Sequence, residues 1–177
     1  MKKEEKRSFL KIVEGTYTLC KCNFEFSENN FNYYILGSSN NLFYVANEED
    51  FIINGFEIRN ISDLDFIDIN RSACSKINEI NKLLANLNAP NIDLCSWETV
   101  INSIKKLNKY CIIQNEYDDM YYIGEIIRVT KDNVYFKHFD SFGKWEEELY
   151  QIPLSSITSI SFDDRYSTTW QKYLTNN

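Results

Sequence analysis

Carboxylates are the side chains most able to do chemistry in this 177-residue sequence. They form short clusters at residues 48–50, 63–65, 118–119, 146–148 and 163–164. Paired carboxylates can bind Mg²⁺ or act as general acid and base, and either use requires two of them to converge in one pocket. Most of these clusters stand beside turn-forming residues, where charged side chains are ordinarily solvated. The functional alternative is an acidic patch that attracts a basic partner.

Histidine and cysteine offer little further material for catalysis or metal binding. His138 is the single histidine, and no serine motif accompanies it to complete a nucleophilic site. Cys20 and Cys22 would direct both sulfur atoms to one face of a strand, a geometry that could hold zinc together with two further ligands. The sequence has no second Cys pair or Cys-His pair at that spacing. We therefore expect reduced thiols in core positions, no metal, no cofactor and no enzymatic activity.

Tyrosine and tryptophan residues stand next to two of the acidic clusters. The chain has 12 Tyr and 3 Trp, more than a small core can enclose, and these residue types are preferred anchors of protein interfaces. The alternative is that the tyrosines fill strand faces with their hydroxyl groups in water. The interface hypothesis predicts that a partner binds next to an acidic cluster, at Asp118, Asp119, Tyr121 and Tyr122 or at Trp145, Glu146, Glu147 and Glu148.

The overall charge narrows the class of partner. Nineteen Lys and Arg residues against 26 Asp and Glu residues give a net charge of −7 and an isoelectric point near 4.8. Such a surface is poorly suited to neutralising phosphates, so nucleic acid is a disfavoured partner. The sequence contains no apolar run of membrane-spanning length, and its charged start is unlike a signal peptide. We expect a cytoplasmic protein without membrane contact.

Short runs of aromatic and β-branched residues between turn formers predict a mainly β protein of the α+β class. Strands are expected at residues 17–26, 32–36, 42–46, 55–60, 64–69, 110–115, 120–129, 133–139, 147–152 and 157–162. Apolar residues at helical spacing predict helices over 75–87 and 96–108, and a short closing helix after Asp163. The short connections between strands favour antiparallel pairing.

The two halves of the chain resemble each other when one is shifted by about 92 or 93 residues. Residues 35–44 then align with 127–136, and residues 61–67 align with 154–160. Chance similarity between Ile-rich segments is the alternative. Each half would hold about five short strands, the content of a small SH3-like or Sm-like barrel. We expect two barrel-like domains at 1–72 and 109–177 and a helical connector at 73–108, with one continuous sheet as the other arrangement.

Several short motifs carry a resemblance to known proteins. In the C-terminal half these are Tyr122-Ile-Gly124, Gly143-Lys-Trp145 and the ending Asp164-Arg-Tyr166. They resemble a pattern in uncharacterised small proteins of low-GC bacteria, a likeness that implies tandem SH3-like or Sm-like barrels and carries no activity. Glu57-Ile-Arg59 is similar to the Ile-Arg-Gly strand of Sm-like RNA-binding proteins, with Asn60 in place of the glycine. That similarity implies Arg59 and Asn60 as RNA-binding residues.

Four functional classes follow from these observations. The favoured one is a non-enzymatic protein-binding module, most concretely an immunity-type or antitoxin-type inhibitor of a basic, nuclease-like effector. The alternatives are an Sm-like RNA-binding protein, a structural protein, and an enzyme that uses paired carboxylates.

Overall fold

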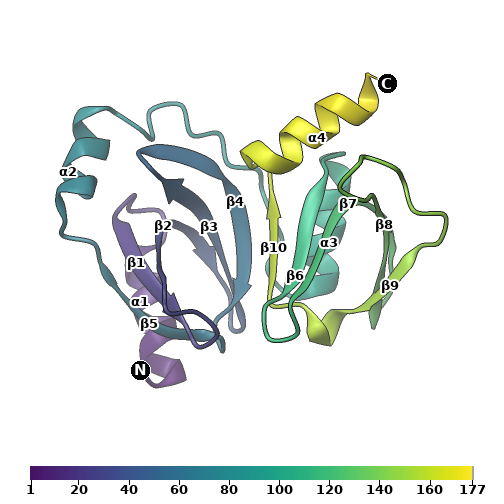
Figure 1. Ribbon diagram of the computed structural model, residues 1–177. Helices are drawn as coiled ribbons and strands as arrows, with labels where there is room; N and C mark the ends of the chain where they lie inside the picture. The colour runs from purple at the N-terminus through teal and green to yellow at the C-terminus, as the bar shows by residue number, and fades with distance from the viewer. Residues whose placement is uncertain (177) are drawn as a thin grey trace.

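The computed structural model describes residues 1–176, and within them the chain forms one antiparallel sheet of ten strands (Figure 1). The strands lie in the order β5-β1-β2-β3-β4-β10-β6-β7-β8-β9. Their bounds are β1 Leu19–Phe24, β2 Asn30–Ser38, β3 Leu42–Glu49, β4 Ile52–Asn60, β5 Leu64–Ile69, β6 Cys111–Asn115, β7 Met120–Val129, β8 Asn133–His138, β9 Tyr150–Pro153 and β10 Ser159–Phe162. The mainly β class and the antiparallel pairing expected from the sequence are confirmed.

Four α-helices and one short 3₁₀-helix accompany the sheet within the same described residues. They are α1 Lys3–Val13, α2 Ala73–Ile80, α3 Trp97–Lys106, η1 Leu154–Ser156 and α4 Arg165–Thr175. Side-chain caps fix where three of the helices begin, because Ser72, Ser96 and Asp164 each accept a hydrogen bond from a backbone N–H of the first turn. No helix in residues 1–176 has both the length and the apolar character needed to cross a membrane.

The helices differ from expectation at two places. The helix expected over 75–87 ends at Ile80, and the backbone at Lys82 has a positive φ of 52°, which a helix cannot contain. The sequence pattern does not predict α1, because the charged residues in the first turns of this helix outnumber the apolar residues of its short buried stripe. Leu10 and Val13 on that stripe are buried against the first half of the sheet.

The sheet is open, and the two expected closed barrels are absent from the described residues. The first five strands lie in the order β5-β1-β2-β3-β4, and the last five lie in the corresponding order β10-β6-β7-β8-β9. β4 pairs with β10 of the other half instead of closing onto β5. Both halves therefore belong to one continuous sheet, with β5 and β9 at its two ends.

The junction between the halves is short. β4 and β10 pair over four positions, from Ser159 opposite Arg59 to Phe162 opposite Phe56. One large buried cluster runs across the junction on one face of the sheet and includes Ile58 and Ile160. A second buried cluster belongs to the first half and a third, smaller one to the second half. The apolar core therefore supports the junction from one face, and the other face carries polar residues.

Gly55 allows the two halves to approach each other closely at one end of the junction. Its φ is +77°, a backbone conformation that L side chains rarely adopt. A Cβ atom at this position would lie 2.4 Å from the backbone nitrogen of Asp164, the residue that caps α4. A side chain at Gly55 would therefore push β4 away from the start of α4.

Replacing Gly55 with alanine should destabilise the protein by more than the cost of placing an L residue at a positive φ. Gly15 provides the matched control, because its φ is +69° and a Cβ there would meet no atom within 4 Å. We expect Gly15→Ala to lower the free energy of unfolding by about 1 kcal/mol. Gly55→Ala should cost about 1–3 kcal/mol more, because of the steric clash. Equal losses of the two variants in urea denaturation would contradict this close packing.

Candidate binding site between the two halves

A buried arginine ties the two halves together on the polar face of the junction. Arg59, on β4, is 5% exposed, and its guanidinium lies 2.8 Å from carboxylate oxygens of both Glu57 and Glu116. Its Nε also donates a hydrogen bond to the hydroxyl oxygen of Tyr33, at 3.2 Å. Glu57 and Tyr33 belong to the first half of the sheet, and Glu116 directly follows β6 of the second half. The Arg59 side chain is therefore a bridge between the halves.

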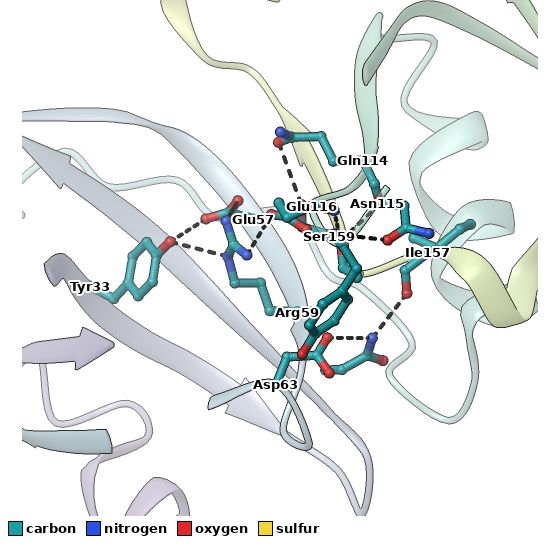
Figure 2. A network of polar contacts seen from close by, with 12 residues as sticks. Tyr33, Glu57, Arg59, Asp63, Gln114, Asn115, Glu116, Ile157 and Ser159 are labelled. Atoms are coloured by element: carbon teal, nitrogen blue, oxygen red, sulfur yellow. Dashed lines mark hydrogen bonds and ion pairs between the residues drawn. The ribbon is translucent and has the colours of Figure 1, made fainter. Parts of the chain in front are cut away.

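The hydrogen bonds continue on both sides of this bridge. The Tyr33 hydroxyl donates to Glu57 at 2.6 Å, and the Ser159 hydroxyl donates to Glu116 at 3.0 Å. Figure 2 shows Tyr33, Glu57 and Arg59 approaching from one half and Gln114, Glu116 and Ser159 from the other. These six residues are called the junction network below.

Strand geometry explains why these side chains meet. Side chains two positions apart on a strand point to the same face, so Glu57 and Arg59 lie together on β4. Ser159 pairs with Arg59 across the β4–β10 ladder, and Gln114 pairs with Ser159 across the next ladder. The insertion of β10 between β4 and β6 thus aligns polar residues from three strands on one face.

Aromatic rings surround the Arg59 guanidinium. Its Cζ lies 4.4 Å from the ring centre of Phe24, 5.6 Å from that of Phe26 and 5.5 Å from that of Phe31. Contacts of this kind stabilise a cation through the negative faces of the rings. Burial alone would lower the pKa of Arg59, but the neighbouring Glu57, Tyr33 and Glu116 outweigh it and raise the pKa well above its usual value. The arginine is therefore permanently charged.

The charges of the junction network do not balance. It contains one guanidinium and two carboxylates, which leaves an excess negative charge where the two halves meet. Glu116 Oε2 is buried and accepts no hydrogen bond from any residue of the described chain. The Glu116 carboxylate is paired with Arg59 and Ser159 through Oε1, and its second oxygen, buried without a donor, favours the approach of a further hydrogen-bond donor such as a cationic group.

A pocket of about 590 Å³ opens beside the network, and we call it the junction pocket. Residues of both halves line it, and they include the Arg59, Glu57 and Glu116 side chains. Further acidic and aromatic lining residues are Phe26, Phe31, Tyr33, Phe56, Asp119, Tyr121 and Asp164. Acidic groups thus outnumber basic ones around an aromatic-walled hollow.

Two of the eight residues predicted as a partner-binding site line the junction pocket. Asp119 and Tyr121 flank the turn between β6 and β7, and both are partly exposed to solvent. Burial raises the pKa of Tyr121, with further contributions from Tyr166 and Asp164, so its hydroxyl stays protonated and can donate a hydrogen bond. Asp118 instead accepts a hydrogen bond from the Asn115 side chain at 2.7 Å and shapes the turn.

Tyr122 lies outside the pocket because neighbouring strand residues point to opposite faces. Its ring packs 4.5 Å from that of Tyr150 and 5.4 Å from that of His138, measured between ring centres. His138 Nδ1 lies 2.8 Å from the backbone oxygen of Ile123. The single histidine therefore contributes to packing and to a backbone contact in this cluster.

The other predicted residues lie in a separate place, between β8 and β9. Trp145, Glu146, Glu147 and Glu148 line a hollow of about 650 Å³, which we call the hairpin pocket. The Trp145 ring packs edge-on against Tyr110 and Phe139, at 5.6 Å and 5.3 Å between ring centres. The two acidic–aromatic clusters predicted from the sequence thus lie on separate surfaces.

The residues of the RNA-binding alternative are engaged in contacts within the protein. Arg59 is buried between carboxylates, as described above. The Asn60 side chain donates to Asp63 at 3.0 Å and to the backbone oxygen of Ile157 at 2.9 Å, and it accepts a hydrogen bond from Trp97. Both side chains therefore have polar partners within the protein.

The thiols occupy a range of environments. Cys20, Cys22 and Cys111 are buried, Cys74 is half-buried and Cys95 is exposed. Burial, together with Asp68, raises the pKa of Cys20 to about 12. Across residues 1–176, no group of three or more His, Cys, Asp or Glu side chains is arranged to hold a metal ion.

Sequence reasoning missed the residues that form the inner part of the site. Glu57, Glu116, Phe26 and Phe31 are not among the residues predicted to bind a partner, although Glu116 lies only two positions before Asp118. The one available signal was the alternation Glu57-Ile-Arg59 on a predicted strand, which places opposite charges on one face. Glu116 could not be found in this way, because its contact with Arg59 joins residues 57 positions apart.

Comparisons of this chain with protein-family models, with curated proteins and with solved structures give no match.

Removing the Arg59 charge should cost much of the protein's stability. Arg59→Met would leave two carboxylates at the junction without a partner, and we expect a loss of about 3–5 kcal/mol in the free energy of unfolding. The control is Lys109→Met, because the Lys109–Asp163 ion pair is partly exposed. That variant should lose less than about 1 kcal/mol. Similar midpoints for the two variants in urea denaturation would show that the bridge is not a main support of the junction.

Proposed function

We propose that this protein is a non-enzymatic protein-binding module that receives a basic partner at the junction pocket. In its most concrete form the proposal is an immunity-type or antitoxin-type inhibitor of a basic, nuclease-like effector. The acidic surface would occupy the groove in which the effector binds phosphates. Its charge would also speed the encounter between the two proteins.

The single observation that carries this proposal is the composition of the junction pocket. Glu57, Glu116 and Asp119 line it together with one buried arginine, and aromatic rings form its walls. Interface anchors are commonly aromatic, and desolvated charge pairs at the centre of an interface contribute specificity. The net charge of −7 adds a long-range attraction for a basic protein.

The strand order supports the finer architectural part of the proposal, two SH3-like or Sm-like halves related by an internal repeat. α1 precedes β1 to β5, and α3 precedes β6 to β10. The five strands of each half follow the same spatial order. We infer that the junction pocket arose where the two copies meet, so that each copy contributes one wall.

The RNA-binding alternative receives less support, since Arg59 is ion-paired with two carboxylates. The fold alone does not favour RNA over protein as a partner, because one architecture serves many functions. The alternative of a structural protein does not account for an acidic pocket at the junction.

Partner capture with matched variants tests the proposed function. Tagged protein is incubated with native lysate at moderate salt, with and without nuclease treatment, and the retained material is analysed by mass spectrometry and for nucleic acid. We expect a stoichiometric basic protein that binds the purified chain directly. Asp119→Lys combined with Tyr121→Ala should weaken this binding at least about tenfold, because the substitutions alter charge and aromatic area at the rim.

The control carries Glu147→Lys alone, which changes the charge of the hairpin pocket by the same two units. It should retain the partner. Capture that depends on the hairpin pocket and not on the junction pocket would contradict the proposed site. Retention of nucleic acid that disappears on nuclease treatment, or of no basic protein at all, would contradict the proposed function.

A further inference from the structure

The junction pocket has features that select one kind of cation. The excess carboxylate of the junction network lies on its inner side, where Glu116 is largely buried, and Asp119 lies at its exposed rim. A cationic side chain that enters between them meets acceptors at two depths. Its positive charge would compensate the buried excess negative charge, a larger gain in a desolvated site than in water.

The aromatic walls favour a planar cation over a compact one. Phe26 and Phe31 line the pocket and also contact the Arg59 guanidinium, so the protein already holds one guanidinium against these rings. A guanidinium is weakly hydrated, stacks on aromatic faces and donates to two carboxylate oxygens at once. A lysine ammonium is strongly hydrated and loses more on leaving water.

The size of the pocket suits a single side chain with its adjoining backbone. Its volume of about 590 Å³ lies within the range of about 300–1,000 Å³ that is usual for sites of small ligands. Tyr121, which also lines the pocket and is 44% exposed, supplies an aromatic ring for the aliphatic part of an incoming side chain and a hydroxyl group that can donate a hydrogen bond.

We propose that the junction pocket binds the guanidinium of one arginine side chain of the partner, between Glu116 and Asp119. This inference rests on the proposed function and names the group that the site recognises. A single arginine derivative should bind the pocket weakly. The whole partner should bind tightly, because it adds contacts around the pocket.

The test is a titration of the full chain with Nα-acetyl-arginine amide, followed by the backbone amide signals of the protein in NMR spectra. We expect saturable shifts at Glu57, Glu116 and Tyr121, with a dissociation constant in the millimolar range. The neutral isostere Nα-acetyl-citrulline amide should bind at least about tenfold more weakly, because it lacks the charge. Nα-acetyl-lysine amide should also bind more weakly than the arginine derivative.

Two variants locate the acceptors. Asp119→Asn removes the rim charge without touching Arg59, and Glu116→Gln removes the inner charge but keeps an oxygen that can accept from Arg59. Each should weaken binding of the arginine derivative about tenfold while the protein stays folded, as judged by its thermal unfolding. Glu147→Gln in the hairpin pocket is the control and should leave the binding unchanged.

Equal binding of the citrulline derivative, shifts confined to residues 144–151, or no saturable shift would each overturn the inference. Tighter binding of the lysine derivative would overturn the choice of guanidinium. These failures are separable from failure of the proposed function. A basic partner captured through the junction pocket without binding of the arginine derivative would reject the inference alone, and the reverse result would reject the proposed partner class.

Discussion

The structure depends on one buried cation that two halves of the chain share. Arg59 extends from β4, and its carboxylate partners come from both sides of the junction, Glu57 beside it and Glu116 across from it. The ladder between β4 and β10 has four paired positions. The ion bridge, together with the apolar cluster on the opposite face, fixes how the two halves meet. Because the bridge contains two carboxylates and one guanidinium, it also leaves an excess of negative charge at the junction. The same residues therefore stabilise the fold and would attract the cation of a partner.

The sequence predicts the elements well where alternation of apolar residues is strong. The strand expected at 120–129 has the observed bounds Met120–Val129, and the strand expected at 64–69 is observed as Leu64–Ile69. α1 is hidden because its charged first turns outweigh a stripe on which Lys6, Leu10 and Val13 are the buried residues. The closed barrels are wrong because the pairing partner of β4 lies about 100 residues further along the chain, where local patterns carry no information.

For the candidate site too, local sequence patterns predict some of the residues, and the contacts between distant strands are not predictable from them. Asp119 and Tyr121 could be named because acidic and aromatic residues are neighbours there in sequence. Strand alternation alone should have separated Tyr121 from Tyr122, which packs on the opposite face against Tyr150. Trp145 packs against Phe139 and also lines the hairpin pocket. Glu116 lies two positions before Asp118 in the sequence, but its contact with Arg59 depends on the order of strands in the sheet and cannot be predicted from local patterns.

Hydrogen exchange of the free protein and of its complex with the basic partner tests the central claim most directly. If the partner inserts at the junction pocket, backbone amides of β4 around Glu57 and of the turn at residues 116–121 should become protected in the complex. Amides of the segment 140–149, beside the hairpin pocket, should exchange at unchanged rates. Protection confined to that segment, with none at the junction, would contradict the account.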